Sequence, residues 1–249
     1  MKTRNIALML ALGLLMQTSF VAMAKDYQAA LFGIKSDGIT MNTRSIQKAI
    51  DFIHDEGGGT LTFYVGRYLT GSFELKQNVK IVLKEGAILV GVPSVYDYKD
   101  LNGKRAMIYA DKQDSISIEG QGRLIGQSDA MIENVRGQVA KGHITNTNRN
   151  SQPSLICFVG CKNVNIKDIF LDDAANTAIV LDNCSNTSLN NVTIQHKTEG
   201  AAALSISDCN GIKAISCYFD TVARPYVSNG SCKDITIDKC ITSTGAEVK

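Results

Sequence analysis

Acidic and imidazole side chains occur in two short segments of the chain that lie a few tens of residues apart. Asp172 and Asp173 form one pair, and His196 and Glu199 lie in the next such segment. Two carboxylates in unequal environments can act as general acid and general base, and a nearby imidazole can tune one of them. We therefore expect Asp173, Glu199 and His196 to be catalytic candidates, provided that the fold brings the segments together.

The same region also supplies cations and an aromatic ring. Lys197 follows His196, and Arg224 and Tyr226 flank a proline one segment later. These side-chain types bind carboxylates and contact sugar rings, so we expect all three to be substrate-binding candidates. Either cation is also a candidate base for a lyase acting on an acidic sugar. The alternative is that all of these residues are ordinary solvated turn residues, the default for charged groups in exposed turns.

The elements that would bring these segments together repeat along the chain. Cys161, Cys184, Cys209 and Cys232 are 23, 25 and 23 residues apart, and the second residue after each is Asn, Asn, Gly or Asp. These residue types tolerate the left-handed backbone of a tight turn. A near-constant period of this length is typical of stacked supersecondary units, in which equivalent turns become neighbours.

Within each unit, apolar and polar residues alternate as they do in a β-strand. Counted from each cysteine, the third position holds Val164, Thr187, Ile212 and Ile235, the fifth holds Ile166, Leu189, Ala214 and Ile237, and the eighth holds Ile169, Val192, Cys217 and Cys240. Strands closed into coils and stacked at about 4.8 Å predict an all-β parallel solenoid with its side-chain rows in register.

The cysteines are interpreted as part of these rows. The chain has 7 of them, so at least one cannot pair within the chain. Side chains that project in parallel from neighbouring coils aim their sulfur atoms poorly for disulfides, and we expect inward ladders of small apolar residues. No Cys-x-x-Cys pair and no acidic calcium loop occurs in the sequence, so we predict no metal site and no cofactor.

The chain is divided into a leader, residues 1–24, and one domain, residues 25–249. The leader combines Lys2 and Arg4 with an apolar run and ends in Ala22-Met23-Ala24, the pattern of a cleaved secretory signal. We expect a secreted or periplasmic protein without a membrane span. The net charge of +2 offers no bulk attraction for nucleic acid.

Three parts are expected within the domain. Residues 25–75 form an N-terminal cap, in which Asn42 begins a helix whose apolar face is Ile46, Ala49, Ile50 and Ile53 and which ends at Gly57-Gly58-Gly59. Residues 127–152 break the period and predict an inserted surface loop. Residues 153–249 form regular coils, and the last of them would offer an open edge for self-association.

Several motifs resemble those of pectin-degrading proteins, in particular the polygalacturonases of glycoside hydrolase family 28. The motifs are Phe32-Gly33-Ile34-Lys35-Ser36-Asp37-Gly38, Ile46-Gln47-Lys48-Ala49-Ile50-Asp51, Gly57-Gly58-Gly59-Thr60, Tyr68-Leu69-Thr70-Gly71-Ser72, Asn78-Val79, Glu85-Gly86-Ala87, Gly120-Gln121-Gly122 and Gly126. The resemblance covers essentially the whole chain after the leader. It implies a single-stranded right-handed parallel β-helix of the pectin-lyase-like type, with a short N-terminal capping helix, and an acidic, pectin-type polysaccharide as partner.

The catalytic pattern of that family is not matched at the corresponding positions. The family places an Asn-Thr-Asp, an Asp-Asp pair and a Gly-His-Gly on successive coils, followed by an Arg-x-Lys. With the cysteines as register, these residues fall at Ala202, at Ala223 and Arg224, and at Ala246, and the Arg-x-Lys would fall beyond Lys249. An alanine neither donates a proton nor activates water.

Three functional hypotheses remain open on the sequence alone. The chain is a hydrolase or lyase with a rearranged site, a catalytically silent β-helix that binds glycans or a partner, or a truncated family member.

Overall fold

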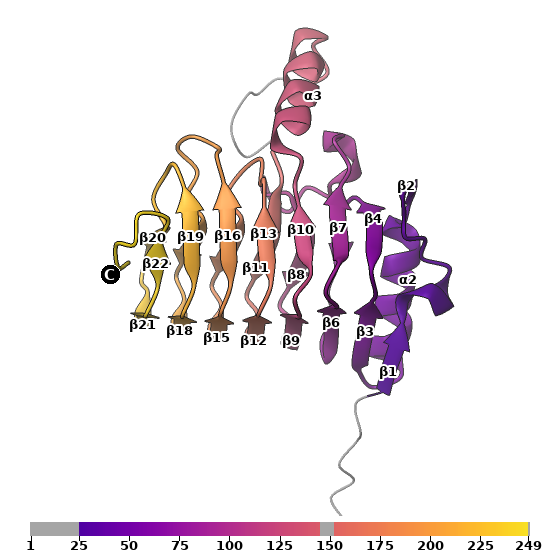
Figure 1. Cartoon of the computed structure of the whole chain (residues 1–249), viewed down its shortest axis with the longest axis horizontal. Coiled ribbons are helices and arrows are strands. Elements are labelled where there is room, and N and C mark those ends of the chain that lie inside the picture. Colours follow the sequence, from indigo (N-terminus) through magenta and orange to yellow (C-terminus); the bar gives the residue numbers. More distant parts are fainter. Residues whose placement is uncertain (1–24, 145–151, 249) are drawn as a thin grey trace, which may run out of the picture.

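The computed structural model of the chain describes residues 25–144 and 152–248. The predicted leader lies outside these described residues. From residue 25 onward the chain winds into a stack of coils, and three parallel sheets run along the length of the stack (Figure 1). The prediction of an all-β, right-handed parallel β-helix is confirmed.

Each sheet takes one strand from successive coils, and we call the sheets A, B and C. Sheet A contains β1 (Lys25–Gln28), β3 (Gly59–Phe63), β6 (Val79–Leu83), β9 (Asp114–Glu119), β12 (Lys162–Lys167), β15 (Ser185–Asn190), β18 (Asn210–Ile215) and β21 (Lys233–Asp238). Sheet B contains β2 (Asp37–Met41), β4 (Gly66–Thr70), β7 (Ala87–Gly91), β10 (Arg123–Ile125), β13 (Phe170–Asp172), β16 (Thr193–His196), β19 (Tyr218–Thr221) and β22 (Ile241–Thr242). Sheet C contains β5 (Phe73–Glu74), β8 (Ala106–Asp111), β11 (Ser154–Val159), β14 (Ile179–Asp182), β17 (Leu204–Ser207) and β20 (Tyr226–Asn229).

The predicted register of the repeat is observed in sheet A. Val164 pairs with Thr187, Thr187 with Ile212, and Ile212 with Ile235. The row that begins at Ile166 is stacked in the same way, and most of its members are fully buried. The core is therefore a set of side-chain rows that run along the axis of the stack.

The cysteines of the repeat occupy the predicted inward rows, whereas Cys157 lies on β11 in a small separate cluster with Ala106 and Tyr109. Six of the seven are buried and Cys232 is partly exposed, and each is a free thiol. Neighbouring coils contact through sulfur, since the backbone N–H of Cys184 donates to Sγ of Cys209 over 3.3 Å. The thiols in turn donate to backbone carbonyls of their own and the preceding coil, as Cys184 does to Asp182 and Phe158.

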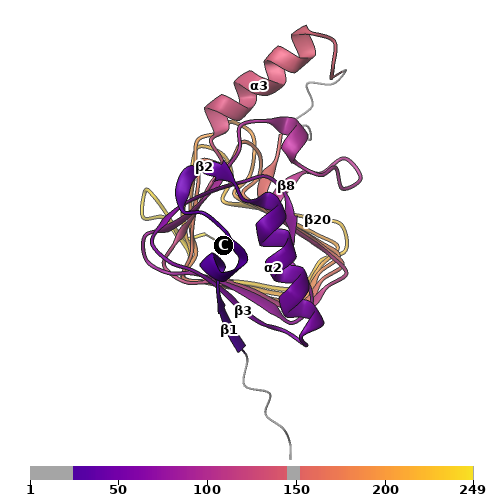
Figure 2. The same ribbon diagram turned by 90° about the vertical axis from the view of Figure 1, so that its right-hand side faces the viewer.

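A helix covers the N-terminal end of the stack. Helix α2 (Thr43–Asp55) lies across the opening, and Ile46, Ala49, Ile50 and Ile53 face the core with no exposed surface (Figure 2). The predicted helix is thus confirmed, and Asn42 occupies its N-cap position as expected. Its side chain makes no cap bond and instead binds the backbone N–H and carbonyl of Lys35, so it ties down the loop before the helix.

The insert was predicted as a loop, and most of its described part is a helix. Helix α3 (Ser128–Ala140) rises from the stack between β10 and β11 and projects beyond it (Figure 1). Only Ser128, Met131 and Val135 are buried, because most of the helix extends past the coils. Its apolar pattern in the sequence is correspondingly weak. Two short 3₁₀ helices, η1 (Ala29–Phe32) and η2 (Val95–Asp97), complete the described elements.

Candidate functional site

The outer face of sheet B carries polar and aromatic side chains in two rows. On β10, β13, β16 and β19 the second residue is buried in the core, so its neighbours on either side face outward. The row at the start of these strands is Arg123, Phe170, Thr193 and Tyr218, and the row two residues later is Ile125, Asp172, Gln195 and Asp220.

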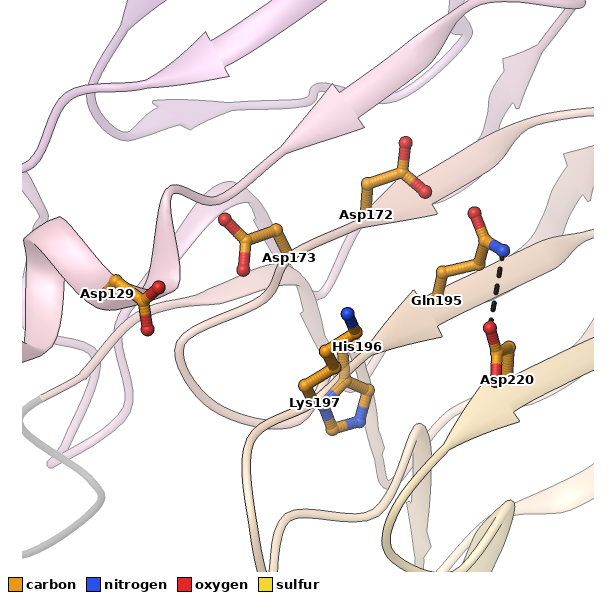
Figure 3. A pocket seen from close by; sticks show the side chains of 7 residues that line it. All are labelled: Asp129, Asp172, Asp173, Gln195, His196, Lys197 and Asp220. Atoms are coloured by element: carbon orange, nitrogen blue, oxygen red, sulfur yellow. Dashed lines mark hydrogen bonds between the residues drawn. The ribbon is translucent and has the colours of Figure 1, made fainter.

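Two pockets lie against these rows. The first, which we call the α3 pocket, has a volume of about 430 Å³ and lies where the strands of sheet B end (Figure 3). It is lined by Asp129, Asp172, Asp173, Gln195, His196, Lys197 and Asp220. The second, the turn pocket, has a volume of about 400 Å³ and is lined by Glu85, Gly86, Gln121, Arg123, Asp168, Phe170, Asn191 and Thr193. We call the two pockets together the sheet B groove.

An ion pair joins the two pockets. The Arg123 guanidinium donates to Oδ2 of Asp172, and it also lies over the Phe170 ring, 4.8 Å from the ring centroid. The second carboxylate oxygen of Asp172 is buried and has no hydrogen-bond partner among the described residues. Asp172 therefore contributes a buried, unpartnered oxygen to the wall of the α3 pocket.

Asp173 fixes the start of helix α3. Its carboxylate accepts the hydroxyl of Ser128 and, over 3.1 Å, the backbone N–H of the same residue. One of the N–H groups that the first turn of a helix leaves unpaired is thereby satisfied. Asp173 has a φ of 54°, in the left-handed region that Asp tolerates better than most residues. Its side chain thus positions the wall of the α3 pocket.

His196 is the most buried polar residue of the α3 pocket. Its exposed fraction is 2%, Nε2 lies 3.5 Å from the Thr221 hydroxyl, and Nδ1 has no partner among the described residues. Burial lowers the pKa of His196, and the carbonyl of Ala202 and the charge of Asp173 offset this only in part. The imidazole is therefore neutral at neutral pH, with one nitrogen available as an acceptor or donor.

The remaining pocket residues lie at the ends of two adjacent strands. Gln195 donates to Oδ2 of Asp220 over 3.5 Å, which is a long contact, and Lys197 follows β16 with its side chain exposed (Figure 3). Asp129, in the first turn of α3, faces them from the helix (Figure 3). The pocket thus combines acceptors from four carboxylates with donors from an amide and an ammonium group.

The structure brings together only some of the residues predicted for the site. Asp173, His196 and Lys197 line the α3 pocket, whereas Glu199, Arg224 and Tyr226 are not among its lining residues. Glu199 and Arg224 are exposed on the turns that follow β16 and β19, and Tyr226 begins β20.

Sequence reasoning missed three lining residues, Asp129, Gln195 and Asp220. The repeat contained a signal for two of them, because Gln195 and Asp220 occupy the register position of Asp172 on the next two strands. Asp129 had no such signal, since it lies in the insert that was predicted as a loop.

The positions that the family resemblance marked as catalytic lie on the turns between sheets B and C. Ala202 is 8% exposed and lies between Ala201 and Ala203, which are more deeply buried. The backbone N–H of Ala203 donates to the carbonyl of Arg224 over 3.1 Å, so the two turns are adjacent. Ala246 lies in the last coil, where its carbonyl accepts the N–H of Thr242.

Within residues 25–144 and 152–248, no group of three or more His, Cys, Asp or Glu side chains is arranged to hold a metal ion. None of the helices in that part of the chain has the length and apolarity that crossing a bilayer requires.

Comparison with known proteins finds a family match by sequence and similar folds among solved structures. The family model described as "Glycosyl hydrolases family 28" matches residues 63–246. A solved structure, described as "a putative glycosyl hydrolase from Parabacteroides merdae", is 48% identical with a TM-score of 0.87, and the match covers 90% of this chain and 99% of that one.

More distant relatives are considerably longer. The family 28 exopolygalacturonase of Yersinia enterocolitica has a TM-score of 0.76 at 18% identity, and the match covers 89% of this chain and 50% of that one, which supports the fold alone. The exo-poly-alpha-D-galacturonosidase of Dickeya chrysanthemi is 36% identical over 83 residues, 33% of this chain and 14% of that protein. This chain therefore matches only a fraction of the length of these two enzymes.

Proposed function

Because the chain belongs to glycosyl hydrolases family 28, we propose that it binds a pectin-type polysaccharide along the sheet B groove and does not cleave it by the family's hydrolytic mechanism. The proposal includes export, which rests on the secretory pattern of residues 1–24 and on the location of pectin outside cells.

The observation that carries the proposal is the chemistry of the turns between sheets B and C. Inverting hydrolysis requires one carboxyl group to protonate the leaving oxygen and another carboxylate to activate water. The positions that correspond to these groups hold Ala202, Ala223 and Arg224. A methyl group transfers no proton, and a guanidinium that stays charged does not act as an acid at neutral pH.

The sheet B groove and the turns beside it carry side chains that can bind a polysaccharide. Phe170 and Tyr218 present ring surface on the first outward row, two strands apart and on either side of Thr193. Lys197 and Arg224, both exposed, supply positive charge on neighbouring coils for the carboxylates of a uronic acid chain. Tyr226 lies next to that edge, at the start of β20. Rings and cations along one face suit a chain of sugars that lies parallel to the axis of the stack.

A second candidate function is hydrolysis by a relocated acid pair. Asp172 and Asp220 are two strands apart in register, which corresponds to about 9.6 Å at the usual strand spacing. Inverting enzymes hold their two carboxyl groups about 6.5–9.5 Å apart. The pair expected from the sequence, Asp173 and Glu199 with His196, is a weaker candidate for this acid pair, because the Asp173 carboxylate already accepts two hydrogen bonds from Ser128.

One experiment separates the two candidates. Purified protein is incubated with partially methyl-esterified pectin, polygalacturonan and rhamnogalacturonan, and we measure retention by the polymer in affinity electrophoresis together with release of reducing ends and of unsaturated uronides. We expect retention that weakens with salt and with Arg224→Gln, and no product of either kind. Lys213→Gln, on an exposed position of β18 in sheet A, is the matched control because it also removes one positive charge.

The other outcomes are informative. Reducing ends that disappear in Asp220→Asn would replace the binding function by hydrolysis with the relocated pair. Unsaturated products that disappear in Lys197→Gln or Arg224→Gln would mean elimination. Absence of retention by every polymer would refute binding.

A further inference from the structure

The two ends of the sheet B groove differ in charge. The α3 pocket is lined by four aspartates and by a single cation, Lys197. Arg123 neutralises one of these carboxylates from the side of the turn pocket, by its ion pair with Asp172. The α3 pocket therefore keeps an excess of negative charge, although two of the proteins that the chain resembles are named for galacturonate polymers.

The aspartates of the α3 pocket come from three elements, namely the end of β13, the strand β19 and the first turn of α3. Asp173 is fixed by its two bonds to Ser128, and Asp172 by Arg123. Asp220 lies on β19 beside Gln195, and Asp129 belongs to the first turn of α3. A carboxylate that entered between them would meet like charges in a partly enclosed site, where screening by solvent and salt is weaker than on an open surface.

Two polar atoms of the pocket residues lack hydrogen-bond partners. Oδ1 of Asp172 and Nδ1 of His196 are both buried and unpartnered among the described residues, and His196 is 2% exposed. A buried polar atom without a partner costs free energy, which a bound molecule can recover by supplying the missing hydrogen bond. A sugar hydroxyl is suited to this task, because it donates to a carboxylate and accepts from an amide, imidazole or ammonium group.

We infer that the α3 pocket binds an uncharged sugar residue, either a neutral sugar or a uronic acid whose carboxyl is esterified, and discriminates against a free uronate. This inference rests on the proposed function and names the ligand class of one part of the same groove. Free uronates of the same polysaccharide chain then lie outside the pocket, toward the exposed Arg224.

The test compares two polymers that differ only in methyl esterification, and therefore in charge. Binding of the protein to partially methyl-esterified pectin, which keeps free uronates for Arg224, and to the same pectin after full de-esterification is measured by affinity electrophoresis and by calorimetry, at low and at moderate salt. We expect the esterified polymer to bind at least tenfold more tightly. In Asp220→Asn, which keeps the shape of the side chain and removes one charge, we expect this preference to shrink several-fold because the de-esterified polymer binds better. Asp234→Asn, outside the groove, should leave the preference unchanged.

The outcomes distinguish this inference from the proposed function. Equal or tighter binding of the de-esterified polymer, or a preference that Asp220→Asn leaves unaltered, would overturn the inference while the binding function stands. A charge change at Asp234 with the same effect as that at Asp220 would also overturn it, because the preference would then be a bulk effect. Failure of both polymers to bind would overturn the two proposals together.

Discussion

A single hydroxyl group in the core should lower the stability of the stack. Thr187 occupies the third-position row of sheet A between Val164 and Ile212, and it is 1% exposed. Its hydroxyl has no hydrogen-bond partner among the described residues. The unfolded chain can hydrate this hydroxyl, whereas the folded chain buries it among apolar side chains.

The magnitude follows from the cost of an unpaired hydroxyl. Mutational data place it at about 1–3 kcal/mol, and valine has nearly the same shape and the same β-branched preference for strands. We expect Thr187→Val to stabilise the protein by about 1–2 kcal/mol. For a chain of this size that corresponds to a rise in the melting temperature of roughly 2–8 °C.

The assay is thermal and urea denaturation followed by circular dichroism, with Thr62→Val as the matched control. Thr62 is also 1% exposed and lies in sheet A, but its hydroxyl donates to Oδ1 of Asp26 over 2.5 Å. Its replacement should therefore destabilise the protein by about 1 kcal/mol. If Thr187→Val lowers the melting temperature as Thr62→Val does, the Thr187 hydroxyl is bonded in solution and the reasoning is refuted.

Two further predictions concern a pair of glycines and a histidine. Gly120 has a φ of +107° and a Cβ there would lie 2.2 Å from the carbonyl oxygen of Leu83, so Gly120→Ala should destabilise the stack by several kcal/mol, roughly 3 or more. Gly137, in α3, has open space around it, and Gly137→Ala should stabilise by about 0.5–1 kcal/mol; equal effects in urea denaturation would contradict this contrast. The pKa of His196 is lowered in the folded state, so the unfolded state binds the proton more readily and stability should fall as the pH drops below the ordinary value of 6.5. His196→Gln should reduce the loss of melting temperature between neutral pH and about pH 5, and an unchanged loss would show that other groups cause it.

The repeat allowed the stack to be predicted in detail, because its cause is local and periodic. Residues such as Val164 and Ile166 alternate with polar neighbours, and the step between cysteines sets the register of every strand after residue 153. Helix α2 was predicted for the same reason, since Ile46, Ala49, Ile50 and Ile53 form one apolar face.

The insert and the site were predicted less well because their structure depends on contacts between distant segments. Helix α3 has a weak apolar face and begins where Ser128 meets Asp173, a residue 45 positions away. The paired state of Asp172 depends on Arg123, one coil earlier in the stack. Asp129 faces the pocket only because α3 directs it there. Turn composition alone contains no information about these contacts.

The insertion of α3 has a consequence for how this scaffold can change. Residues 126–153 connect β10 to β11, whereas residues 173–178 make the same connection one coil later, yet β10 pairs with β13 and β11 with β14 without a break in register. The pairing of the strands therefore does not depend on the length of the segment that joins them. Residues of such a segment can be substituted or inserted while the sheets keep their register. The segment that holds α3 and the short turn that holds Ala201, Ala202 and Ala203 are two such segments on one stack, so the residues that face a ligand can change while the strands keep their pairing.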